Sequence, residues 1–348
     1  MRGFKVSVLA GLFGFGALTA AVSAEAAVLR VPAQFPDIQA AVDAATAGDQ
    51  VLVGPGSYCG ATIDKPLTLL GIRNPTIVGC AEPALPSGAR LGFLLDGVAG
   101  SSPASGTRIA GFTFDGEGVS NTNLEPLAFG VLGRFASDVR VVGNRFLGTV
   151  QAITNTAGDR WAILQNSIEG LTVFDCTALC TGGDGIVLQS ARGALAVPGG
   201  EALAANRPEF NLIANNRITG EIPDGFGVFS FAGVLVLAGD NNAIVRNTIS
   251  IPDNPLADAT GQGVLITNVC CGVLDPIVPG SRNTLIALND VRRSEIGIVI
   301  EGSAGDNTTG LSLFQNRGSV ELEGVLQPDT PRPRAPRRFR GGFKHHAS

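Results

Sequence analysis

Two short patterns recur along much of this chain. The first is an apolar residue, a spacer, an asparagine, a spacer and a second apolar residue; it occurs at Asn144, Asn166, Asn216, Asn247 and Asn289, and in a weaker form at Asn316. The second is a glycine followed by alternating apolar residues, and it begins at Gly185, Gly233, Gly263 and Gly297. Each pattern predicts a strand of about four or five residues with one buried face.

Strands this short are not stable alone, so their recurrence predicts a solenoid in which stacked coils bury a continuous core. A recurring corner asparagine suits a ladder in which each side-chain amide bonds to the next coil; the alternative is that asparagine is simply a common turn residue. A β-propeller is the main rival architecture, but its blades usually carry an aromatic signature. The chain has one Trp and one Tyr, which argues against a propeller.

One segment near the start has a helical pattern instead. Asp37 precedes an apolar stripe formed by Ile38, Ala41, Val42 and Ala45, which predicts a short amphipathic helix with Asp37 as its N-cap. The open end of a solenoid exposes unpaired strand edges. We therefore expect this helix to lie over the first coil, with residues 51–53 beginning the stack.

The two ends of the chain depart from the repeats. Arg2 and Lys5 precede an apolar stretch, and Ala24 or Ala26 supplies a small residue for cleavage, so residues 1–26 are predicted to be an export signal. The alternative is an uncleaved anchor. Residues 327–348 are rich in Pro and Arg, carry a net charge of +5, and are predicted to be a disordered basic tail. Residues 27–326, the expected β-helix domain, carry 17 basic and 28 acidic residues, a net charge of −11.

The opening of the domain resembles a known superfamily. "FPDIQAAVDAATAGDQVLVGPGSY" from Phe35 to Tyr58, followed by "KPLTLLG", is similar to the opening of many right-handed parallel β-helix proteins of the pectin lyase-like superfamily. "IAGFTFDG" from Ile109 and the asparagine-containing coils resemble the repeats of the same superfamily. The resemblance covers about residues 28–326. It implies an all-β fold, a single right-handed parallel β-helix with an N-terminal capping helix, and it does not determine an activity.

The cysteines favour an oxidising compartment, and hence a periplasmic or extracellular location. Cys59 and Cys80 are 21 residues apart, about one coil, so we predict a bridge between them. A second, local bridge is predicted between Cys176 and Cys180. For Cys270 and Cys271, a vicinal bridge and free thiols both remain open. No metal site is expected, because there is no pair of CxxC motifs and both histidines lie at the extreme C-terminus.

Asp184 and Asp224 are the candidate catalytic residues. Each precedes a glycine at the start of a predicted strand, so the two carboxylates are candidates for a pair on neighbouring coils. The alternative is that each Asp-Gly is only a corner. Polygalacturonases use a histidine that this domain lacks, and the segment "LGTVQAITN", which resembles one in pectin methylesterases, has Gln151 where that family has a catalytic Asp. These absences favour a protein that does not cleave polysaccharide efficiently.

Arg145 and Arg217 are the candidate binding residues. Both follow a ladder asparagine, and an outward row of arginines could meet uronates. Ser167 and Thr248 occupy the same position on other coils, so the alternative is a pair of solvated surface arginines. The two excursions at residues 172–183 and 192–208 are further places where binding could reside.

No cofactor is expected. Ca²⁺ could draw an oxygen from Asp240 or Asp306, but neither turn has the ligand spacing of a dedicated site. Trp161 is predicted to be partly buried in the stack, and the phenylalanine-rich segment from Phe226 to Phe231 could expose one ring.

The sequence therefore favours an exported, non-catalytic β-helix that binds or scaffolds at the cell surface or in the periplasm. Its expected partner is a polysaccharide or a component of the cell envelope. The alternatives are a divergent polysaccharide lyase or glycoside hydrolase, and an adhesin-like structural stalk. No specific recognition of nucleic acid and no membrane span beyond the export signal are expected, and the sequence does not predict an oligomeric state.

Overall fold

A computed structural model describes residues 26–98, 102–119, 123, 125–173, 183–190, 206–222, 224, 231–257, 260–267, 269–270, 273–274, 280–301 and 309–323. The predicted basic tail, Cys176, Cys180, Asp306 and all but the last residue of the predicted export signal lie outside the described residues. Within the described residues, no helix is both long and apolar enough to span a membrane.

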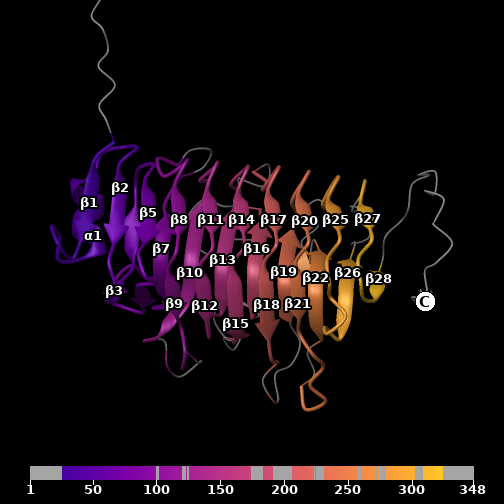
Figure 1. Cartoon of the computed structure of the whole chain (residues 1–348). Helices are drawn as coiled ribbons and strands as arrows, with labels where there is room; N and C mark the ends of the chain where they lie inside the picture. Colours follow the sequence, from indigo (N-terminus) through magenta and orange to yellow (C-terminus); the bar gives the residue numbers. More distant parts are fainter. Residues whose placement is uncertain are drawn as a thin grey trace, which may run out of the picture.

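The strands form three parallel sheets that wrap around one core (Figure 1). Sheet A contains, in spatial order, β1 (Val28–Val31), β2 (Gln50–Val53), β5 (Thr68–Gly71), β8 (Arg108–Ala110), β11 (Arg140–Val142), β14 (Ala162–Leu164), β17 (Leu212–Ala214), β20 (Ala243–Val245), β25 (Leu285–Ala287) and β27 (Ser312–Phe314). Sheet B contains β3 (Ser57–Cys59), β6 (Thr76–Val78), β9 (Thr113–Asp115), β12 (Arg145–Leu147), β15 (Ser167–Leu171), β18 (Arg217–Gly220) and β21 (Thr248–Ser250).

Sheet C contains β4 (Ala61–Ile63), β7 (Arg90–Leu95), β10 (Leu127–Arg134), β13 (Gln151–Thr156), β16 (Asp184–Gln189), β19 (Phe231–Leu237), β22 (Gly261–Thr267), β26 (Ile296–Glu301) and β28 (Val320–Glu323). A separate antiparallel hairpin joins β23 (Val269–Cys270) to β24 (Val273–Leu274). From β2 to β22 the chain passes through sheets A, B and C in turn, and the last two coils, β25–β26 and β27–β28, contribute strands to sheets A and C. Each inner strand of these sheets pairs in parallel with its counterparts on the coils before and after it. This order makes the molecule a parallel β-helix, and parallel crossovers of this kind are right-handed.

A short helix closes the N-terminal end of the stack, as the sequence predicts. Helix α1 (Ile38–Ala44) buries Ile38, Ala41 and Val42, and the carboxylate of Asp37 accepts a 2.8 Å hydrogen bond from the Ala40 N–H. The Gln39 amide accepts from the Thr62 N–H at 2.8 Å and donates to its carbonyl at 3.3 Å. Because Thr62 lies on β4, the edge strand of sheet C, the Gln39 side chain makes the hydrogen bonds that a neighbouring strand would otherwise make.

The asparagine ladder at the corner between sheets A and B is confirmed. The ladder consists of Asn144, Asn166, Asn216, Asn247, Asn289 and Asn316. The backbone N–H and the Nδ2 of each asparagine before Asn316 donate to Oδ1 of the next asparagine. The Nδ2 of every member also donates to a main-chain carbonyl. The first five are at most 3% exposed. Because each buried amide hydrogen-bonds to neighbouring coils, these asparagines connect the coils in addition to forming the corners.

The recurring glycines make room inside the coil. A Cβ added to Gly130 would collide with the ring of Phe146, and one added to Gly233 would collide with Ile249. At these two positions, core side chains from sheet B therefore occupy the space that a larger residue would need on the sheet C strand. Phe146 in turn stacks on Phe114, with ring centroids 4.6 Å apart.

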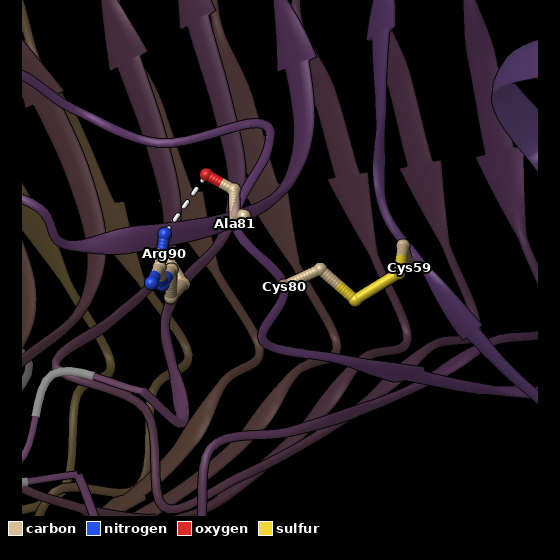
Figure 2. Close-up of a disulfide and its surroundings, with 4 residues drawn as sticks. All are labelled: Cys59, Cys80, Ala81 and Arg90. Carbon is tan, nitrogen blue, oxygen red and sulfur yellow. Dashed lines mark hydrogen bonds between the residues drawn. A yellow bond between two sulfur atoms is a disulfide. The ribbon is translucent and has the colours of Figure 1, made fainter.

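A disulfide joins Cys59 to Cys80, as the sequence predicts (Figure 2). Cys59 ends β3, and Cys80 follows the neighbouring strand β6, so the bridge links two adjacent coils of sheet B. Arg90 donates a 2.8 Å hydrogen bond to the Ala81 carbonyl just beyond the bridge, which ties the excursion between β6 and β7 to sheet C (Figure 2).

Candidate functional site

The outward row of sheet B holds both candidate binding arginines. The register places Arg145, Ser167, Arg217 and Thr248 side by side on β12, β15, β18 and β21. The two arginines therefore lie two strands apart, about 10 Å along the stack. Ser167 interrupts the row between them, as the alignment of the coils predicts.

Arg145 is held by a residue that the sequence analysis missed. Its Nε lies 3.3 Å from Oε1 of Glu169, and its Nη2 lies 2.9 Å from Oε2 of the same carboxylate. Ser167 donates a 2.9 Å hydrogen bond to Glu169 Oε1. The signal for Glu169 was its position two residues after Ser167, which places both side chains on the outer face of β15.

The ion pair sets the protonation of both groups. The hydrogen bond from Arg145 lowers the pKa of Glu169, against a smaller opposing effect of burial. The hydrogen bond to Glu169 raises the pKa of Arg145. Both groups stay charged at neutral pH, and their side chains are 53% and 38% exposed.

A groove runs beside this pair at the corner between sheets B and C. It has a volume of about 330 Å³ and is lined by Glu117, Gly118, Val119, Arg145, Leu147, Gly148, Glu169, Gly170 and Thr172. We call it the sheet B groove. Its floor requires Gly148, because this residue has a φ of +57° and an added Cβ would lie 2.9 Å from the Glu117 Cα. The groove gathers three charged side chains, Glu117, Arg145 and Glu169, from adjacent coils.

The outer face of sheet C is closed rather than open. Leu132, Val187 and Leu265 lie in register on it and are at most 7% exposed. Asp184 is part of the same face, in a row with Gln151, Ala232 and Gln262. These outward side chains are therefore shielded from solvent.

Asp184 is therefore buried. Its side chain accepts a 3.1 Å hydrogen bond from the Ala232 N–H, and the residue is 3% exposed. Burial raises the pKa of Asp184 to about 7, and the hydrogen bond opposes that shift. Gln151, its neighbour on β13, is 5% exposed and accepts a hydrogen bond from Thr154.

Asp224 does not stack on Asp184. The register places Ala232 beside Asp184, whereas Asp224 is exposed in the turn after β18 and accepts a 2.8 Å hydrogen bond from Asn254. Asp184 is the first residue of β16, whereas Asp224 comes before β19 and lies outside any strand. They do not form the neighbouring pair that was considered from the sequence.

Trp161, Phe231 and Asp240, which were considered from the sequence, are buried or have structural contacts, and so does Lys65. Trp161 is 1% exposed, more deeply buried than predicted, and its Nε1 donates to the Ala136 carbonyl at 2.6 Å. Phe231 is fully buried. Lys65 donates to the Val42 and Ala45 carbonyls at the C-terminal end of α1. Asp240 accepts a 2.6 Å ion-paired hydrogen bond from Arg207.

No group of three or more His, Cys, Asp or Glu side chains that could hold a metal ion occurs in the part of the chain that the structure describes. The Arg207 contact occupies one oxygen of Asp240, which leaves it poorly placed as a calcium ligand.

Comparison with known proteins gives the following. No family model and no curated protein matches the chain. PfbA, a surface adhesin of Streptococcus pneumoniae, has a TM-score of 0.42 at 13% identity, over 86% of this chain and 92% of its own. An alginate lyase from Paenibacillus sp. str. FPU-7 has a TM-score of 0.45 at 12% identity, over 87% of this chain and 99% of its own. The catalytic domain of a GH87 alpha-1,3-glucanase has a TM-score of 0.38 at 10% identity, over 87% of this chain and 67% of its own.

The order of the three parallel sheets decides the fold class. The fold is a right-handed parallel β-helix. The similarities to solved structures carry no conclusion about activity, since one fold of this kind serves unrelated functions.

Proposed function

We propose that this protein is an exported, non-catalytic β-helix that binds a hydroxyl-rich polysaccharide in the sheet B groove. One observation carries the proposal: Arg145 and Glu169 of the groove are ion-paired with each other, while the carboxyl with a pKa near neutrality, that of Asp184, is buried in sheet C. Export is supported by the Cys59–Cys80 bridge, which suits an oxidising compartment.

Acid–base catalysis needs a carboxyl that reaches the substrate and has a pKa near the working pH. Glu169 reaches the groove, but Arg145 lowers its pKa and occupies both of its oxygens. Asp184 has a suitable pKa of about 7, but it is 3% exposed and cannot contact a polymer in this conformation. Neither carboxyl combines both properties.

The groove is better suited to holding a sugar than to cleaving one. Arg145 and Glu169 fix each other, so their remaining donors and acceptors are already oriented before a ligand arrives. Glu169 balances the positive charge of Arg145 and Glu117 adds a negative charge, so the groove does not favour an anionic ligand. Its volume of about 330 Å³ lies at the small end of ligand sites, which fits a short stretch of a chain rather than a whole oligosaccharide.

The chain offers a matched control for the test. Arg160 makes an equivalent two-bond contact with Asp138, at 2.7 and 2.8 Å, at the corner between sheets C and A. Its side chain is 54% exposed, against 53% for Arg145. Arg145→Gln and Arg160→Gln therefore remove the same interaction at different places.

Binding would be screened by electrophoresis through gels containing neutral and anionic polysaccharides, and then measured by calorimetry. We expect Arg145→Gln to weaken binding about tenfold, because a charge-assisted hydrogen bond is worth about 1.5 kcal/mol. Arg160→Gln should leave it unchanged. Equal effects of both substitutions would contradict the proposed groove, and no binding by the unaltered protein would favour the adhesin-like stalk.

The second candidate function is that of a divergent lyase or hydrolase, and the raised pKa of Asp184 is the observation that favours it. The protein would be incubated with pectate, methylated pectin and alginate, with and without Ca²⁺, while unsaturated uronates, methanol and reducing ends are followed. We expect no sustained product. Product that Asp184→Asn abolishes and Asp224→Asn preserves would make Asp184 the catalytic residue instead.

A further inference from the structure

The two ends of the stack differ in how their edge strands and core are covered. At the N-terminal end, α1 covers the core and Gln39 pairs with both backbone groups of Thr62. At the other end, β27 is the last strand of sheet A and β28 the last of sheet C (Figure 1). No described strand pairs with the outer edge of either one, so no described strand occupies their outward backbone groups.

The core is also exposed at this end. The inward residue of each sheet A strand from β2 to β25 is fully buried, and Ile286 on β25 is the last of them. Its counterpart on β27 is Leu313, which is 39% exposed, and the adjacent Phe314 is 54% exposed. An open strand edge beside exposed core side chains is a docking surface.

Two opposite charges flank this surface. Arg317 follows β27 on the sheet B side and is exposed. Glu321 lies on β28, where it pairs in register with Val299 of β26, whose side chain is on the outer face of sheet C. Neither side chain has an ion-pair partner among the described residues.

We propose that this surface, formed by β27, β28 and Arg317, binds a second copy of the same chain, end to end. A two-fold axis through Leu313, perpendicular to the stack, brings β27 against the partner's β27 as an antiparallel pair. The same rotation exchanges the sheet B and sheet C sides. It therefore places Arg317 opposite the partner's Glu321, and symmetry repeats that contact on the other side.

The covered N-terminal end disfavours a head-to-tail arrangement. There α1 covers the first coil, and the Gln39 amide occupies the backbone groups of Thr62 that a further strand would need. Contacts between two C-terminal ends use the same surface twice and close after two copies. The product is a dimer about twice the length of one stack, not a filament.

The test is a charge exchange in the full chain. Sedimentation velocity and light scattering would follow the mass over a range of concentrations for the unaltered protein, Arg317→Glu, Glu321→Lys, and the double variant. We expect each single reversal to raise the dimer dissociation constant at least tenfold, and the double variant to recover most of the loss. Arg108→Glu, on the exposed face of β8, is the control that should change nothing.

Several outcomes would overturn the proposal: a monomer at every concentration, a dimer that tolerates both single reversals, or a double variant that is no better than the singles. Masses that grow without limit would contradict the closed geometry. If the full chain is monomeric but a chain ending at Glu323 dimerises, residues 324–348 cover this end, and the occupant is the chain's own C-terminal segment.

Discussion

Among the described residues, Asp184 is the side chain whose pKa is most altered by its surroundings. Burial raises the pKa of its carboxyl to about 7, from 3.8 in an exposed group. The folded protein therefore holds this proton up to about pH 7, whereas the unfolded chain releases it near pH 4. Because the folded state binds more protons in this window, the contribution of Asp184 to stability falls as the pH rises through it.

Asp184→Asn should remove the loss of stability that the unaltered protein shows as the pH rises. The amide carbonyl can still accept from the Ala232 N–H, and no carboxylate has to be buried. We expect the variant to match the unaltered protein at pH 4 and to be more stable at pH 8, by at most about 4 kcal/mol. Calorimetric melting at both pH values measures this. Burial also raises the pKa of Asp159 and Glu209, so only the difference between the two proteins reports on Asp184. An equal shift at both pH values would contradict the assignment.

At the scale of the elements, the asparagine ladder connects one coil to the next. Asn216 accepts from the backbone and side-chain amides of Asn166, and it donates to Ile163 and Asn247. Asn316 at the end of the ladder also accepts two bonds, but it is only partly buried and has no further asparagine to donate to among the described residues.

Asn216→Ala should cost about 3 kcal/mol of unfolding free energy, because it leaves the buried Asn166 N–H without an acceptor. Asn316→Ala should cost about 1 kcal/mol, because water can replace the lost contacts at a partly buried position. Urea denaturation of both variants measures the difference. Similar costs at the two positions would mean that the ladder is not the source of the stability.

At the scale of the whole molecule, charge is unevenly distributed. Residues 327–348 carry a net charge of +5, and residues 27–326 carry −11. A chain ending at Leu326 should lose any affinity for polyanions, because the remaining protein repels them. Its melting temperature should stay within about 2 °C, since a segment this rich in Pro and Arg cannot bury a core. Heparin affinity chromatography and thermal melting test the two expectations, and a large fall in melting temperature would show that the segment packs on the stack.

Three features followed from local sequence. Asp37 before an apolar stripe predicted the capping helix, the repeated corner asparagines predicted the ladder, and the spacing of Cys59 and Cys80 predicted their bridge. Each depends on residues within one coil or on a repeat of one coil length. Such short-range patterns survive folding because a solenoid places each coil directly on its neighbour.

The site was less accessible to this reasoning. Glu169 was overlooked because its importance lies in reaching Arg145, which is 24 residues earlier in the chain. Asp184 and Asp224 look alike in sequence, each before a glycine, yet one is buried in a sheet and the other is exposed in a turn. The lengths of the turns between sheets B and C differ from coil to coil, so similar local sequences enter different registers.

The sequence by itself determined the class of this protein: the strand periodicity, the helix that covers the first coil, and the corner residues all follow from backbone preferences and hydrophobic alternation. The tertiary structure alone decided which face is closed and which is open. The outer face of sheet C and the outer face of sheet B alternate in the same way along the chain, but Val187 is buried while Arg145 is half exposed. Burial of an outward side chain depends on what lies over it in space, and alternation along a strand cannot encode that.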